Sequence, residues 1–349
     1  MPSFSIKPPS DYSLLRDACS YGYFLLAPNR WNVDEQALSR GLNIGKEVVG
    51  VVITQPGGKG KPLKVRVDRA LALAQRKQAE ALIRRMLRLD EDEAHVRAFH
   101  KVDPRWKRSG RARLFRSPTL FEDVLKTVTS CNVTWPGTVQ MNRRLCEVVG
   151  KRTPSGLLTF PTASALARAR PQTLRSQCRV GYRDLRIIEL ARLFATHAPE
   201  VRIIEDPSTP DDVLHETLLE LPGVGPYAAA NIMQLLGRYS RLPLDTESVR
   251  HGRSVLGYTG NSKQVMKRVH EHFAPFESHA FRSYWFEMWV HYEKLQGPAH
   301  TWERDTTGTM FTAAQLKKLA EANGLPNPKR SAASSSPARK ARRSAPARK

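Results

Sequence analysis

Residues 211–252 read DDVLHETLLELPGVGPYAAANIMQLLGRYSRLPLDTESVRHG, and the predicted fold is organised around this stretch. Its first part has the apolar spacing of a helix, which ends where Pro222 follows a leucine. Gly223 and Gly225 then flank Val224, and glycine allows both a positive φ and a close approach of the backbone to a ligand. The pattern predicts a helix that ends in a tight glycine turn.

A second helix is predicted directly after this turn. Pro226 suits a first helical turn, where its missing N–H costs nothing, and the alanine-rich run after it extends to Gly237, a typical C-terminal stop. The start of such a helix presents unpaired N–H groups that attract an anion such as a phosphate. For the turn alone, a corner between two helices without any ligand is the alternative interpretation.

An aspartate follows the second predicted helix, in the segment LPLD at residues 242–245. At this point LPGVGPYAAANIMQLLG followed by LPLD resembles the helix-hairpin-helix (HhH-GPD) DNA glycosylases. This superfamily includes endonuclease III, the adenine glycosylase that acts opposite oxidised guanine, and the alkylpurine and 8-oxoguanine glycosylases. Asp245 also suits the N-cap of a helix beginning at TESVR, and a capping residue that faces a pocket is still available for chemistry.

The resemblance implies a fold and a set of site residues. The implied fold is mostly α-helical with a small N-terminal antiparallel β domain, as in the alkylpurine and 8-oxoguanine branch. In the family the hairpin, here Gly223, Val224 and Gly225, grips the backbone of the damaged strand, and the following aspartate, here Asp245, is the essential catalytic carboxylate. Bifunctional members place a lysine two residues beyond the second glycine. Here Tyr227 takes that place, and we expect it to line the base pocket.

The predicted N-terminal domain covers residues 1–88. Residues 20–67 contain the β-branched or aromatic runs SYGYFLLA, EVVGVVITQ and PLKVRV, with a GGKGK turn at 57–61, which is typical of antiparallel hairpins. The intervening NVDEQALSRGL, residues 32–42, is compatible with a strand or with a short helix. A basic, amphipathic helix is predicted from Arg69 onward.

Two segments of the predicted helical domain resemble core helix pairs of the family. Residues 121–150 resemble the first pair, and residues 160–194 resemble the next pair, including its Gly-Tyr-Arg loop. By this resemblance Asn132 fills the gap left by an extruded nucleotide, while Tyr182 wedges between bases with Arg183 beside it as a phosphate contact. In the alternative interpretation, Asn132 caps a helix break and Tyr182 packs at a corner.

The predicted helical domain covers residues 89–300 and closes with an aromatic stretch at 273–297. We expect this stretch to form a long helix that belongs mainly to the core, because an aromatic stripe at helical spacing usually packs inside. His279, His291 and Trp285 are its candidates for reaching a pocket.

The charge of the chain predicts a nucleic-acid partner. The sequence of 349 residues has a formal charge of +23 and a pI near 10.3. Residues 301–349 read as a linker and a basic tail, and the last part, 326–349, has eight Lys or Arg and no acid, which predicts disorder. No run is apolar enough for a membrane span or a signal segment, so we expect an intracellular, DNA-associated monomer, in the bacterial cytoplasm and nucleoid or in a nucleus.

Four cysteines are scattered through the chain without any C-x-x-C pair. Endonuclease III and several relatives carry a four-cysteine iron–sulfur cluster after the helical domain, but this chain has no cysteine after Cys178. We therefore expect no cluster, no protein-bound catalytic metal and no organic cofactor. The family's hairpin often holds a monovalent cation through carbonyl groups.

The sequence therefore predicts a DNA N-glycosylase of base excision repair that binds double-stranded DNA and hydrolyses a damaged base, with a purine favoured. A monofunctional enzyme is expected, because the phenol of Tyr227 cannot form the imine that lyase chemistry needs. A bifunctional glycosylase/lyase and a non-catalytic helix-hairpin-helix DNA-binding protein are the alternatives. The family's usual Asp-Thr-His-Val is Asp-Thr-Glu-Ser here, which leaves open whether the base is an alkylated purine or 8-oxoguanine.

Overall fold

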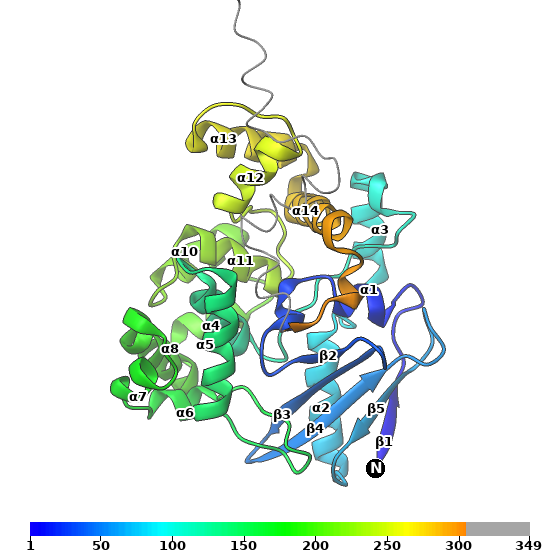
Figure 1. Cartoon of the computed structure of the whole chain (residues 1–349), viewed down its shortest axis with the longest axis vertical. Helices are drawn as coiled ribbons and strands as arrows, with labels where there is room; N and C mark the ends of the chain where they lie inside the picture. Colours follow the sequence, from blue (N-terminus) through cyan, green and yellow to red (C-terminus); the bar gives the residue numbers. More distant parts are fainter. Residues whose placement is uncertain (305–349) are drawn as a thin grey trace, which may run out of the picture.

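A computed structural model of the protein describes residues 1–304 (Figure 1). Five strands form one antiparallel sheet near the N-terminus, and helices make up most of the remaining described chain. The strands are β1 (Ser3–Ile6), β2 (Arg30–Asn32), β3 (Ala37–Ile44), β4 (Glu47–Thr54) and β5 (Leu63–Val67). The predicted fold class, mostly α with a small N-terminal antiparallel sheet, is confirmed.

The described α-helices, apart from α1, follow strand β5 along the chain. They are α1 (Leu14–Ala18), α2 (Leu73–Met86), α3 (Glu93–Val102), α4 (Leu120–Ser130), α5 (Trp135–Val148), α6 (Ala163–Ala167), α7 (Pro171–Ser176), α8 (Asp184–Thr196), α9 (Pro199–Glu205), α10 (Asp211–Glu220), α11 (Pro226–Leu236), α12 (Thr246–Ser254), α13 (Ser262–Phe273) and α14 (Ala280–Gln296). Short 3₁₀ turns are η1 (Gly22–Leu25), η2 (Pro104–Trp106), η3 (Gly181–Arg183), η4 (Ala274–His279) and η5 (Ala299–Thr301).

The sheet has the strand order β1-β5-β4-β3-β2, and every pair is antiparallel. In β5, Leu63, Val65 and Val67 are buried while Lys64 and Arg66 are exposed, which is the alternation expected of a strand with one face in the core. The basic helix predicted after the sheet is α2. It lies against the sheet in Figure 1 and shares a hydrophobic cluster with β3, β4 and β5.

The strand predicted for residues 20–27 is wrong. The segment forms the 3₁₀ turn η1, and its residues are buried almost without alternation, because the turn is enclosed between the sheet and the helices. Residues 32–42, for which the sequence is compatible with a strand or a short helix, are extended at both ends. They form the end of β2 and most of β3. Strand β1 was not predicted, since its four residues are too short a run to give a period-two signal.

Two hydrophobic clusters form the interior. One joins the sheet with α2, α3, α13 and α14, and the other lies among the helices from α4 to α11. The predicted borders at residues 88 and 300 stay predictions. The basic tail predicted at 326–349 lies outside the described residues, as does all but the start of the linker before it.

A buried ion-pair group ties the sheet to the first core helix. Glu122 of α4 accepts hydrogen bonds from Arg40 of β3 at 2.8 Å and from Lys126 at 2.7 Å, and all three side chains are almost completely buried. Although burial opposes ionisation, the two cations hold the pKa of Glu122 at about 2. This carboxylate therefore fixes the sheet and α4 relative to each other.

No helix within residues 1–304 has both the length and the apolar character of a membrane span.

The aromatic stretch predicted as one helix at 273–297 is divided, because Glu277 takes a positive φ of 50° and a ψ of −123°. The regular helix α14 starts only at Ala280.

Candidate active site

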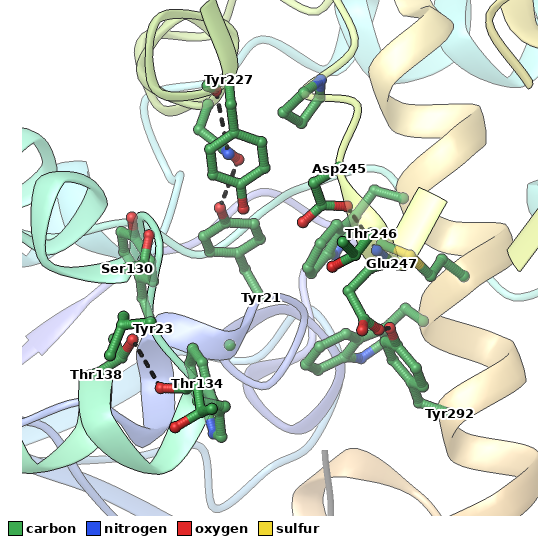
Figure 2. A pocket seen from close by; sticks show the side chains of 18 of the residues that line it. Tyr21, Tyr23, Ser130, Thr134, Thr138, Tyr227, Asp245, Thr246, Glu247 and Tyr292 are labelled. Atoms are coloured by element: carbon green, nitrogen blue, oxygen red, sulfur yellow. Dashed lines mark hydrogen bonds between the residues drawn. The ribbon is translucent and has the colours of Figure 1, made fainter. Parts of the chain in front are cut away.

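A cavity of about 440 Å³ lies where η1 and helices α4, α5, α11, α12 and α14 meet (Figure 2). Eight of its described lining residues are aromatic, namely Tyr21, Tyr23, Trp135, Tyr227, Tyr284, Trp285, Trp289 and Tyr292. A largely apolar hollow with a few convergent polar groups is the usual form of a ligand site.

The aromatic wall is held in place by contacts between the two ends of the described chain. The ring of Tyr21 packs on Trp285 with centroids 4.6 Å apart, and the Trp285 indole donates a hydrogen bond to the Ser20 carbonyl at 2.8 Å. The Tyr21 hydroxyl donates to the side chain of Asn231 at 3.0 Å. These bonds fix both rings, so the wall is formed before any ligand binds.

Asp245 is the N-cap of α12, as predicted, and it also lies in the cavity wall. Its Oδ1 accepts hydrogen bonds from the backbone N–H groups of Glu247 at 2.9 Å and Ser248 at 3.1 Å, and from the Ser248 hydroxyl at 3.3 Å. Within residues 1–304, Oδ2 accepts no hydrogen bond and no cation pairs with the carboxylate. One oxygen therefore holds the helix and the other is available to a ligand.

The environment of Asp245 disfavours its charge. Burial raises the pKa of the carboxyl above its ordinary value, and the nearby charge of Glu247 adds to this, while the hydrogen bonds from the start of α12 oppose it. A buried carboxylate with a raised pKa in a cavity is a candidate for catalysis. Such a group gains most when positive charge develops next to it.

Tyr227 stands beside Asp245 in the cavity wall, as predicted for a pocket residue (Figure 2). Burial and the charge of Asp245 raise the pKa of its hydroxyl well above the ordinary value, so the phenol stays protonated. No lysine is present among the lining residues that the structure describes.

The glycine hairpin joins α10 and α11 as predicted. Gly223 has a φ of +82°, a backbone conformation in which a side chain would be strained. Val224 is buried and anchors the turn. Gly225 has an extended backbone and open space around it, and the helical hydrogen bonds of α11 begin only with the N–H of Ala229. The turn therefore presents backbone N–H groups at an accessible surface.

Asn132 and the Gly181-Tyr182-Arg183 turn lie next to each other, although they are fifty residues apart in the sequence. Asn132 is exposed in the turn between α4 and α5, with a φ of +51° that asparagine tolerates better than most residues. The Arg183 guanidinium donates to the carbonyl groups of Cys131 and Asn132, at 2.5 and 3.4 Å. It therefore links the two turns.

Arg183 is poorly exposed for the phosphate contact expected of it. The residue is only 6% exposed, and its guanidinium is occupied by backbone carbonyls. Tyr182 is 58% exposed, as a wedge residue has to be, and the guanidinium of exposed Arg186 lies 5.5 Å from the centre of its ring. Arg186, four residues beyond Tyr182, is the more exposed cation, and its i,i+4 spacing from Tyr182 is a signal in the sequence that could have identified it.

Comparisons with known proteins bear on the fold. No family model and no curated protein matches the sequence. Solved structures do match. The 3-methyladenine DNA glycosylase of Archaeoglobus fulgidus has 17% sequence identity and a TM-score of 0.58, over 83% of this chain and 98% of the archaeal one. The 8-oxoguanine glycosylase/lyase of Clostridium acetobutylicum, bound to DNA with cytosine opposite 8-oxoguanine, has 18% identity and a TM-score of 0.59, over 83% and 98%.

The chain has the helix-hairpin-helix DNA glycosylase fold. Within this glycosylase fold, Asp245 and Tyr227 line one cavity and the hairpin directly precedes Tyr227 in the chain, whereas Asn132 and Tyr182 lie on turns outside the cavity wall.

Several residues that line the cavity were not predicted as site residues. Tyr21 and Trp289 come from distant parts of the chain, and no local pattern marks them as neighbours of Asp245. Trp285, a candidate from the aromatic stretch, does line the cavity, but the other two candidates do not. His279 packs against Phe99, and His291 lies beside another histidine of α12.

Proposed function

We propose that this protein is a DNA N-glycosylase that extrudes a damaged base from duplex DNA and hydrolyses its bond to the sugar. The observation that carries the proposal is Asp245, a partly buried carboxylate without a cationic partner in residues 1–304, in the wall of an aromatic-rich cavity. The names of the two matching structures support a base-releasing activity, and one of them holds duplex DNA.

The residues around the cavity suit the handling of a distorted duplex. Chemistry on a base needs the nucleotide outside the stack, so an enzyme of this kind has to hold the bent backbone and fill the gap. In the proposal the hairpin N–H groups near Gly225 bind a phosphate, Tyr182 wedges into the stack and Asn132 fills the vacated place. Arg186 supplies the positive charge first expected of Arg183.

The proposed reaction develops positive charge on the sugar. As the glycosidic bond breaks, its electron pair leaves with the base and the sugar becomes oxocarbenium-like. Asp245 stabilises this charge and takes a proton from the water that adds to C1′. No metal or organic cofactor is needed for these steps, so we expect excision to continue at an unchanged rate in EDTA.

We propose that the enzyme is monofunctional. Tyr227 occupies the place of the family's lyase lysine, its hydroxyl stays protonated, and the described cavity wall contains no amine. Borohydride treatment during excision should trap no covalent enzyme–DNA adduct, and strand breaks should appear only after alkali. A strong adduct that is lost on mutation of one lysine would contradict this part of the proposal and favour the glycosylase/lyase.

The base is proposed to be a damaged purine. One matching structure is named for 3-methyladenine and another for 8-oxoguanine. Excision should be measured on matched duplexes that carry 3-methyladenine, 7-methylguanine, hypoxanthine, 8-oxoguanine, uracil or an oxidised pyrimidine. Release of at least one purine and no pyrimidine is the expected result. Binding to all duplexes without release of any base would instead indicate a non-catalytic DNA-binding protein.

A further inference from the structure

The charge of the cavity is opposite to that of the whole protein. The chain has a formal charge of +23, yet the described lining residues include two carboxylates, Asp245 and Glu247, and no Lys, Arg or His. Both acids come from the N-terminal end of α12 and face the same hollow (Figure 2). Eight aromatic residues of the described chain, whose ring faces also attract cations, line the same cavity. A positively charged ligand therefore fits this cavity better than a neutral or negative one.

Glu247 is held so that one of its oxygens is fixed and the other is not. Its Oε2 accepts hydrogen bonds from the Tyr292 hydroxyl at 2.7 Å and from the guanidinium of Arg250, which also donates to the Tyr292 hydroxyl at 2.8 Å. Within residues 1–304, Oε1 accepts no hydrogen bond. We call the hydrogen bonds from Tyr292 and Arg250 to Glu247 the clamp. Arg250 is not a lining residue, so the clamp orients Glu247 without placing a cation in the wall.

We propose that Glu247 selects the extruded base, with Oε1 accepting a hydrogen bond from a purine that is positively charged through alkylation of a ring nitrogen. The inference rests on the proposed glycosylase function and specifies its substrate class. A charge-assisted hydrogen bond of this kind favours the cationic base over a neutral purine of similar size. Glu247 binds the base, whereas Asp245 acts on the sugar.

The chemistry of the leaving group agrees with this choice. When the bond of a cationic purine breaks, the electron pair passes to the base, which leaves neutral and needs no proton. A neutral purine would leave as an anion and would require a general acid. Because the cationic base loses its charge in the reaction, Glu247 stabilises the bound state more than the transition state. Its removal should therefore act mainly on KM.

The test compares wild type with Glu247→Gln on duplexes that carry a single 7-methylguanine, which is cationic, or a single hypoxanthine, which is neutral. For 7-methylguanine we expect KM to rise about tenfold, the size of one charge-assisted hydrogen bond, with kcat no lower than in wild type. For hypoxanthine KM should not change. Tyr292→Phe, which weakens the clamp, should give a smaller rise in KM for 7-methylguanine only.

A matched control removes one glutamate charge outside the cavity. Glu271 of α13 is 58% exposed and pairs with Lys267, so Glu271→Gln should leave KM for both substrates unchanged. Equal KM values for Glu247→Gln and wild type on 7-methylguanine would overturn the inference, as would a wild-type enzyme that releases only neutral purines. A wild-type protein that releases no base at all would instead contradict the proposed function.

Discussion

Glu122 is a fully buried carboxylate and Asp245 a partly buried one, and their surroundings are opposite. Glu122 is paired with Arg40 and Lys126, and its pKa is lowered to about 2. Asp245 is bound by N–H and O–H groups alone, it has no cationic partner within residues 1–304, and its pKa is raised. The first acid is fully compensated by the fold, whereas the second still lacks a positive partner.

The difference shows how a fold separates stability from function. The charges around Glu122 are satisfied before any ligand arrives, so that group can only hold the sheet and α4 together. The cost of burying Asp245 is offset only when positive charge appears in the cavity, which the proposed sugar cation provides. Buried acids of this second kind are therefore the ones to test for catalysis.

The largest expected effect is on stability. Glu122→Ala leaves Lys126 and Arg40 buried without their partner, and we expect the free energy of unfolding to fall by about 3–5 kcal/mol. Glu80→Ala, which breaks the more exposed i,i+4 pair with Arg84, should cost only about 0.5 kcal/mol and serves as the control. Urea titrations measure both. If Glu122→Ala and Glu80→Ala each lowered the free energy of unfolding by the same small amount, Glu122 would not be the strongly paired structural acid that the contrast with Asp245 requires.

A smaller effect is expected on the pH dependence of excision. Asp245 must be ionised to act, so activity is lost as the pH falls through its raised pKa. Glu247 raises this pKa and Ser248 lowers it, so Glu247→Gln should move the acid limb to lower pH and Ser248→Ala should move it to higher pH. Single-turnover rates across acidic and neutral pH measure both shifts. Shifts in the same direction would contradict the assignment of the acid limb to Asp245.

The smallest expected effect is a gain in stability from Asp245→Asn. The folded-state pKa of Asp245 is raised, so the ionised carboxylate destabilises the fold at neutral pH, and this cost disappears as the pH falls below the ordinary pKa. Asparagine keeps the N-cap. The variant should therefore melt slightly above wild type at pH 7, and the difference should vanish in acid. A lower melting temperature at pH 7 would indicate that the carboxylate is mainly structural.

Much of the fold could be predicted because its signals are local. The hairpin glycines, the stop at Gly237 and the N-cap at Asp245 each depend on a few adjacent residues, and the structure has each of them where the sequence placed it. Local reasoning failed for residues 20–27, whose aromatic run suggested a strand. Tertiary packing encloses that segment as a turn. Because it is buried on all sides, it has no alternation of apolar and polar residues that would distinguish a strand from a turn.

The candidate site could be predicted only in part. Asp245 and Tyr227 follow from the motif, but Tyr21 and Trp285 meet only through the fold, at opposite ends of the described chain. Arg183 has the residue type of a phosphate contact, and only the structure shows that its guanidinium is used by the Asn132 turn. Residue type and spacing therefore identified Asp245 and Tyr227 as candidates, but they did not predict the burial of Arg183 or the composition of the aromatic wall.

The most direct test of the central claim is single-turnover excision by wild type and Asp245→Asn on a duplex that carries one damaged purine, with each protein saturating. We predict that wild type releases the base, leaving an alkali-labile strand. The variant should fold normally and bind the duplex at least as tightly, but its excision should be slower by a factor on the order of 100 or more. An Asp245→Asn rate equal to that of wild type would contradict the catalytic role of this carboxylate.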